Sequence, residues 1–141
     1  MDIEERAELL AAANEELLVT LADTLIEIHG DPSVIAPPET VLVAFDVREP
    51  VEDIRFRVGD VIVSRAEVEI AGVPGWGVRP GDDHLGAIAA AICAAVGDAG
   101  LNGSEDVDTL CQQIAAERSA ADLAEWAQIA ATRVQFEELD W

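Results

Sequence analysis

The side chains best suited to chemistry are His84 and a group of arginines that precedes it. His84 follows a glycine-containing loop, Arg79 to Asp83, and opens an expected helix. The free backbone N–H groups at a helix N-terminus attract anions, so His84 is a candidate anion-binding residue. The same pattern is typical of a histidine packed against the end of a sheet. In that case Asp82 or Asp83 caps the helix rather than binding a metal.

Arginines concentrate in one part of an otherwise acidic chain. Residues 48 to 79 contain five arginines and six acids, a net charge of −1 that leaves −20 for the remainder. A guanidinium can bind phosphate through two N–H groups at once, so this segment could hold an anion or an acidic partner surface. The candidates are Arg55, Arg57, Ser64 and Arg65. Pairing with carboxylates is the alternative, and for Arg65 we favour it, with Glu67 or a partner as the source.

Known catalytic patterns are missing from the sequence. It has no phosphate-cradling glycine-rich loop, no Gly-x-Ser-x-Gly or Cys–His nucleophile, and no cluster of metal ligands. Cys93 and Cys111 are 18 residues apart and form no Cys-x-x-Cys motif, so we expect two free thiols in the core. We therefore predict no catalytic residue, no metal site and no cofactor held by this chain alone.

The overall charge restricts the partners. The chain has 29 acids and 8 bases, a net charge of −21, and every base is an arginine. Such a chain repels nucleic acids and anionic membranes. A specific basic partner and adaptation to high salt both explain the charge, and we favour the second because the acids are spread along the whole chain. The apolar runs are too short for a membrane span, and the acidic residues 1–5 do not resemble a secretory leader, so we expect a cytoplasmic protein.

Hydrophobic periodicity predicts one α+β domain over residues 1–141, with a small antiparallel sheet of about four strands flanked by N-terminal and C-terminal helices. The central strand starts at Val61, because Ile62, Ala66, Val68 and Ile70 alternate with charged residues, and Gly59 marks a bulge or a close backbone approach. Other extended segments are expected at 34–36, 41–47 and 76–79, with a turn at 37–40. Helices are expected at 3–12, from 14 to about 23, at 84–96 and at 104–131, with 25–29 and 132–136 outside them. The alanine-rich helix at 84–96 allows another element to pack close against it.

Four stretches of the sequence, taken together, carry a resemblance to a known family. The central stretch is Phe56-x-x-Gly59-Asp60, Ser64-Arg65-Ala66-x-Val68, Trp76 and His84. The others are Arg6 to Leu10 with Glu16-Leu17, Val34-Ile35 with Pro38-Glu39-Thr40, and Thr132-Arg133-Val134-x-Phe136. In this order they resemble the PhnG family, a small subunit of the carbon–phosphorus lyase machinery. The family usually carries a Gly-Arg-Asp-Lys-type loop before the histidine, and much of that positive charge is missing or moved here.

The resemblance implies a subunit that acts in phosphonate breakdown with PhnI-type, PhnH-type and PhnJ-type subunits and a PhnL-type protein. The step assigned to this group joins methylphosphonate to the ribose C1 of ATP, the co-substrate of the complex, and displaces adenine. The product is α-D-ribose 1-methylphosphonate 5-triphosphate, and the larger PhnI-type subunit is thought to carry the chemistry.

We therefore expect a mainly structural, assembly role for this chain. The sheet and the alanine-rich helix would be buried against a partner, and Arg65, His84 and Arg133 would shape that interface or a shared anion pocket. The alternative is a free-standing homodimeric module that binds anions or nucleotides through Arg55, Arg57 and Arg65.

Overall fold

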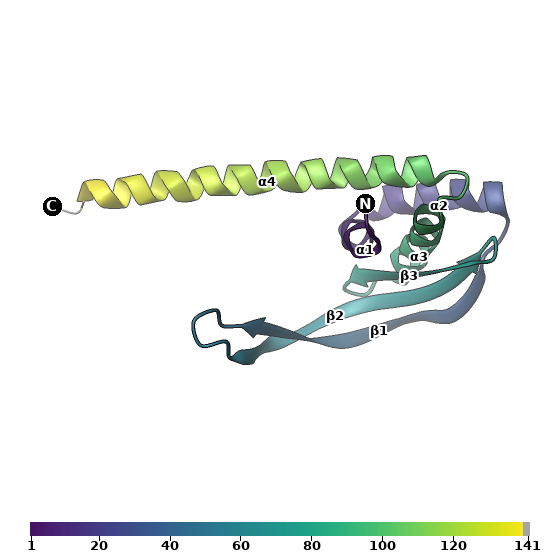
Figure 1. Ribbon diagram of the computed structural model, residues 1–141, viewed down its shortest axis with the longest axis horizontal. Helices are drawn as coiled ribbons and strands as arrows, with labels where there is room; N and C mark the ends of the chain where they lie inside the picture. The colour runs from purple at the N-terminus through teal and green to yellow at the C-terminus, as the bar shows by residue number, and fades with distance from the viewer. Residues whose placement is uncertain (140–141) are drawn as a thin grey trace.

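The computed structural model describes the backbone of residues 1–139 and their side chains, except those of 45, 47 and 132–139. The elements in chain order are α1 (Ile3–Ala11), α2 (Glu15–His29), β1 (Ser33–Arg48), β2 (Arg55–Ile70), β3 (Val73–Pro80), α3 (His84–Ala99) and α4 (Ser104–Leu139). The strands form one antiparallel sheet in the order β1-β2-β3 (Figure 1). The predicted α+β class is confirmed, with three strands where the sequence predicted about four.

The strand count differs because β1 runs through the predicted turn at residues 37–40. Pairing with β2 shifts register between Val34 and Ala36 and again between Ala36 and Glu39. The two prolines in this stretch lack N–H donors and cannot complete the ladder, so they interrupt the pairing without ending the strand. A third shift, between Phe45 and Asp46, lies opposite Gly59. The predicted bulge is therefore confirmed.

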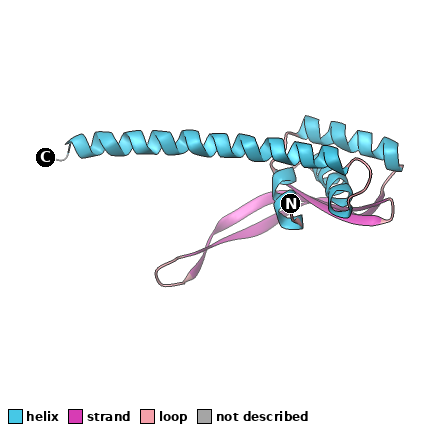
Figure 2. Cartoon of the chain, turned by 45° about the horizontal axis from the view of Figure 1, so that its top comes forward, coloured by secondary structure: helices cyan, strands magenta, loops and turns pink. Residues whose placement is uncertain are grey.

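The alanine-rich helix α3 is the centre of the core. It packs against β2 and β3 on one side and against α1, α2 and α4 on the other (Figures 1 and 2). The close neighbour of α3 is β3. A Cβ added to Gly77 would lie only 2.4 Å from the Ala87 carbonyl oxygen, and one added to Gly75 only 2.3 Å from that of Ala91, so the helix backbone lies directly against these glycines. Since the chain itself buries α3, the expectation that this helix is buried against a partner is wrong.

Two helices are longer than predicted. α2 continues to His29 because Leu18, Ala22 and Leu25 are buried at helical spacing. This packing outweighs the weak strand-like alternation at 25–29. α4 continues to Leu139, so residues 132–136 stay helical.

Among the described residues no single helix is long and apolar enough to cross a membrane. In that part of the chain, α3 and α4 satisfy the test of length and composition together, as a pair bent by 113°.

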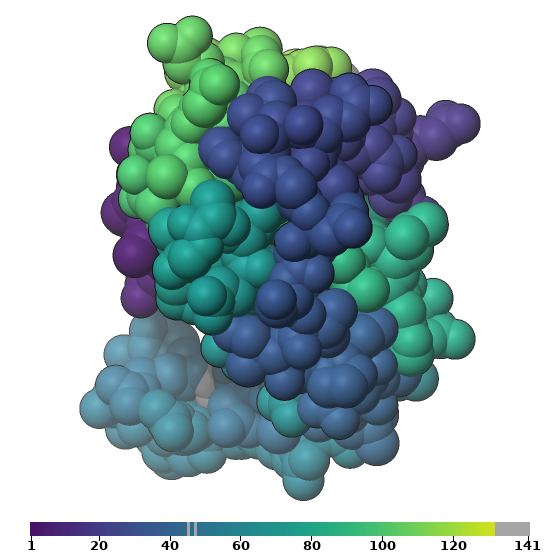
Figure 3. Space-filling view, turned by 90° about the vertical axis from the view of Figure 1, so that its right-hand side faces the viewer, coloured from purple at the N-terminus to yellow at the C-terminus, as the bar shows by residue number. Residues whose placement is uncertain are grey.

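Two parts of the chain project from this body. Residues 42–62 of β1 and β2 form a two-stranded hairpin, the arm, and residues 116–131 form the α4 extension. Both project in the same direction in Figures 1 and 2. Every described side chain of the two segments is exposed, except the half-buried Glu49. Figure 3, viewed from the opposite end, shows the arm at the bottom and α4 at the top, with the body between them.

Candidate functional site

The arm has an apolar face that nothing in the described chain covers. Side chains alternate along β2, but the extra residue at the bulge beside Gly59 reverses the alternation. By the register, Phe56 therefore faces the same side as Val61 and its partner Val43, the side away from the helices, whereas Ile62 faces the side of the buried residues from Ser64 to Ile70. Val43, Val61 and Phe56 are 47%, 45% and 48% exposed, whereas Val68 and Ile70 are at most 1% exposed. Leu42, directly opposite Ile62 on β1, is also exposed. The open face of the sheet therefore continues into the arm as an uncovered apolar surface.

The opposite face of the arm carries two of the predicted arginines. Arg57 forms an ion pair with Asp60, three residues along the same strand. Arg55 is exposed and forms no ion pair with any described residue. At the tip, Arg48 pairs with Asp53 at 3.3 Å. The sequence grouped these arginines with Ser64 and Arg65, but the structure places Arg55 and Arg57 on the arm and the other two beside the body.

Arg65 and Ser64 lie on opposite faces of β2. Arg65 contacts Glu39 on the neighbouring strand through its Nε at 2.7 Å and its second terminal nitrogen at 2.6 Å. Ser64 is fully buried, where its hydroxyl donates to the Gly81 carbonyl oxygen at 2.7 Å and accepts from the Asp83 N–H at 2.8 Å. Arg65 is therefore paired within the chain, by Glu39 and not by Glu67, and Ser64 fastens the loop after β3 to the sheet.

His84 lies beside Ser64 at the start of α3. Its Nε2 is 2.8 Å from the Thr40 hydroxyl, which donates to Asp82 Oδ1 at 2.8 Å. Asp83 accepts from the Gly86 N–H at 2.9 Å and so caps the helix, as the capping alternative predicted. His84 and Ser64 are thus brought together through Thr40, whose hydroxyl is 3.5 Å from that of Ser64. In the part of the chain that the structure describes, no three His, Cys, Asp or Glu residues are placed to hold a metal ion.

Arg79 has a structural role that the sequence reasoning missed. Its terminal nitrogen donates to three carbonyl oxygens at the end of α1, those of Leu10, Ala11 and Ala13, at 3.0, 2.9 and 2.6 Å. Its Nε donates to Asp83 at 3.0 Å, and the side chain is buried. The available signal was the position of Arg79 in β3, in phase with the inward-facing Gly75 and Gly77. Arg133, the last predicted site residue, lies outside the described side chains.

Arg6, from the N-terminal stretch of the resemblance, is likewise buried. It pairs with Asp98 and, at 3.2 Å, with Asp108. Burial lowers the pKa of this guanidinium, but the hydrogen bonds to the two carboxylates outweigh burial, and the net pKa is raised. Arg6 therefore ties α1 to the end of α3 and the start of α4.

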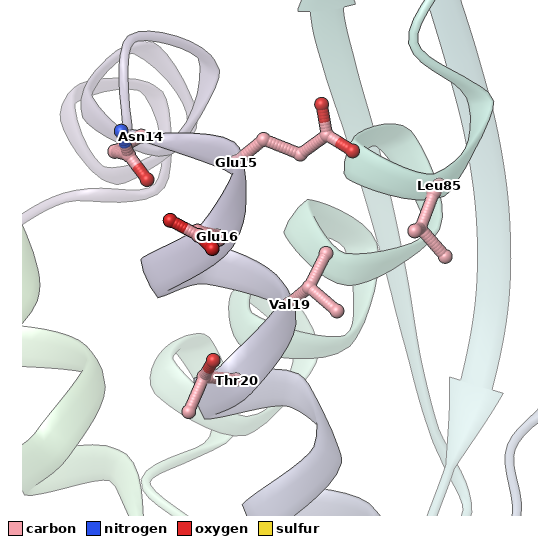
Figure 4. A pocket seen from close by; sticks show the side chains of 6 residues that line it. All are labelled: Asn14, Glu15, Glu16, Val19, Thr20 and Leu85. Carbon is pink, nitrogen blue, oxygen red and sulfur yellow. The ribbon is translucent and has the colours of Figure 1, made fainter.

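Two hollows of similar size lie beside the first turn of α3 and beside Arg65. The first, of about 480 Å³, lies between the start of α2 and the first turn of α3, and Glu15 reaches across it toward Leu85 (Figure 4). The second, of about 470 Å³, lies on the sheet face opposite the helices. It is lined by Ala36, Pro37, Glu39, Arg65, Ala66, Glu67, Trp76, Gly77 and Val78.

Comparison with known families decides the relationship of this chain. The family model for phosphonate metabolism protein PhnG matches residues 4–140. The chain belongs to the PhnG family. A search of curated proteins found no significant match. Membership in PhnG confirms the resemblance seen in the sequence and places the protein in phosphonate metabolism.

Proposed function

We propose that this PhnG chain is an assembly subunit of the carbon–phosphorus lyase system, completed when other subunits cover its arm and its α4 extension. One observation carries the proposal: on the open face of the sheet, Val43, Val61 and Phe56 form an apolar pattern along the arm, about half exposed, that no described element covers. A strand that faces only water on both sides has no reason to keep that pattern.

The energetics of the arm support the same conclusion. A two-stranded hairpin is at best marginally stable in water, and both strand edges of the arm beyond β3 offer unpaired backbone groups. A partner that adds a strand or packs on the apolar face would satisfy these groups and remove apolar surface from water, at about 25 cal/mol per Å². The α4 extension offers Leu123, Trp126 and Ile129, all at least half exposed, on the side of the molecule from which the arm also projects (Figure 1).

The biochemical role follows from the family. We propose that the chain supports formation of α-D-ribose 1-methylphosphonate 5-triphosphate from ATP and methylphosphonate, with a PhnI-type subunit carrying the chemistry. PhnH-type and PhnJ-type subunits and a PhnL-type protein complete the set of partners, and ATP is the co-substrate of the complex. In this role the chain acts in the cytoplasm, and its surface of −21 net charge is adapted to high salt.

Co-expression with a PhnI-type protein tests the assembly role. Replacing both Phe56 and Val61 with serine should abolish co-purification on size-exclusion chromatography, because the two side chains belong to the uncovered apolar face. The matched control is Val51→Ser, which removes a still more exposed apolar side chain from the tip and should leave the complex intact. Runs at low and molar salt separate apolar association, which survives salt, from charge pairing, which is screened. A complex that tolerates the double substitution would contradict the proposal.

The free-standing module that binds anions or nucleotides remains a second candidate, because Arg55 is exposed and has no ion-pair partner among the described residues. Calorimetric titration of the isolated chain with ATP and with methylphosphonate separates the two functions. Binding by the isolated chain that is lost in Arg55→Ser supports the module. Binding that requires a PhnI-type partner supports the assembly subunit.

A further inference from the structure

The hollow on the open face of the sheet is built around a tryptophan and a glutamate. Trp76 on β3 and Glu67 on β2 are directly opposite each other in the antiparallel register, so their Cβ atoms are about 5 Å apart. Trp76 is 50% exposed although it is a large aromatic residue. The wall toward β1 is formed by Ala36 and Pro37, where that strand twice leaves its regular register. Bulges of this kind often re-aim a strand beside a binding site.

The charges in this hollow favour a cation. Glu67 is exposed and forms no ion pair with any described residue, so its carboxylate is available beside the indole. Glu39 and Arg65 neutralise each other at 2.6 Å. The hollow therefore has a net charge of −1, and its one guanidinium is already paired. A phosphate in this hollow would be repelled by the free carboxylate of Glu67, and the one guanidinium of the lining is already paired.

We propose that this hollow receives the guanidinium of an arginine side chain presented by a partner subunit, an inference that rests on the assembly role proposed above. A guanidinium can lie flat on the face of Trp76 and donate N–H groups to Glu67, an arrangement that combines cation–π attraction with a charge-assisted hydrogen bond. Charge complementarity points to a partner as the source, because the lining of the hollow is acidic and its one guanidinium is already paired with Glu39. The open sheet face that holds the hollow also continues directly into the arm.

Nuclear magnetic resonance of the isolated full-length chain tests this site. The protein is labelled with ¹⁵N-tryptophan at low salt, and the Trp76 indole signal is assigned by its loss in Trp76→Phe. The probe is the peptide acetyl-Gly-Arg-Gly-amide. We expect a saturable shift of the Trp76 indole signal, no saturable shift with the citrulline analogue, which has the same shape without the charge, and a weaker response to the lysine analogue.

Two matched substitutions separate the site from the general acidity of the surface. Glu67→Gln should weaken peptide binding roughly two- to fivefold, the range for one exposed charge pair. Glu69→Gln removes the same charge from the same face of β2, but Glu69 is opposite Pro74 and outside the hollow, so binding should be unchanged. Equal weakening by both substitutions, or an absent or equal response to the citrulline or lysine peptide, would overturn the proposal.

The same sample distinguishes a cation site from an anion site. A saturable shift of the Trp76 indole with inorganic triphosphate, in place of the arginine peptide, would assign the hollow to an anion and overturn the inference. A negative result in the peptide titration can be distinguished from failure of the assembly role, because that role is measured by arm variants in the co-expressed complex. If the peptide binds and the Phe56/Val61 double variant still forms the complex, only the role of the arm is contradicted. If that variant loses the complex and the peptide does not bind, only the role of the hollow is contradicted.

Discussion

Ile62 and Ser64 point to the same side of β2, two residues apart, yet Ile62 is 52% exposed and Ser64 is completely buried. The loop after β3 causes the difference. Gly81 and Asp83 hydrogen-bond to the Ser64 hydroxyl and close the core over it. Beyond this point the described chain places no element over the strand. The limit of the chain's own core therefore lies between these two residues.

This limit predicts that the same substitution, isoleucine to alanine, costs much stability inside the core and little in the arm, although both positions lie on the same face of β2. Ile70→Ala, at 1% exposure, should lower the free energy of unfolding of the isolated chain by roughly 2–5 kcal/mol. Ile62→Ala should lower it by less than about 1 kcal/mol, because its side chain is already half in water. Urea unfolding at two protein concentrations measures both. A large, concentration-independent loss in Ile62→Ala would show that the arm is covered within the chain.

Arg79 and Arg65 also differ in burial, because Arg79 lies in the core and Arg65 on the surface. Arg79→Met should cost roughly 3–5 kcal/mol of unfolding free energy, because it leaves largely buried Asp83 without its ion-pair partner and removes a donor from three carbonyl oxygens at the end of α1. Arg65→Met breaks an exposed pair with Glu39 and should cost less than about 1 kcal/mol. The two variants remove the same charge, so thermal unfolding separates burial from charge. Similar losses in both would contradict the assignment of Arg79 to the core.

The sequence predicted which face of β2 points inward, because a period of two is a local property. It could not predict how far along the strand that face is covered, since coverage depends on where α3 lies. The prolines of β1 were misleading for a related reason: pairing with β2 holds the strand together across a stretch that is a turn by composition. The end of α2 was missed because tertiary packing of Leu25 decided it.

The candidate site was harder to predict than the fold. A guanidinium looks the same in a sequence whether it binds an anion, an internal carboxylate or a helix end. Only the register shows that Arg65 lies opposite Glu39, and only the phase of β3 shows that Arg79 points inward. The pairing of Trp76 with Glu67 was also hidden, because it depends on the length of the turn between β2 and β3.

The contact between β3 and α3 predicts a strong effect of one added methyl group. In Gly77→Ala the new Cβ would lie 2.4 Å from the Ala87 carbonyl oxygen, so α3 must move away from the sheet. We expect a loss of roughly 1–3 kcal/mol or more in unfolding free energy. Gly59→Ala, in the arm, meets nothing within 4 Å and should be neutral or slightly stabilising. Equal effects in a denaturant titration would contradict the close approach of strand and helix.

The two buried thiols predict how stability depends on alkaline pH. Burial, with a smaller effect of neighbouring Cys111, raises the pKa of Cys93 from 9.0 to about 12, and burial raises the pKa of Cys111 to about 11. Between these values the unfolded chain has lost thiol protons that the folded chain keeps. Folding stability should therefore be complete below about pH 9 and decrease above it, by about 1.4 kcal/mol per pH unit and per thiol.

The composition of the chain simplifies the interpretation of unfolding free energy between pH 9 and 11. The sequence has no tyrosine and no lysine, and arginine stays charged, so the thiols are the side chains that titrate between pH 9 and 11. Cys93→Ala should reduce the slope of unfolding free energy against pH to about half, and the double variant with Cys111→Ala should flatten it, whatever stability each loses at pH 7. Urea unfolding across this range measures the slopes. A full slope in the double variant would show that other groups, and not these thiols, govern alkaline unfolding.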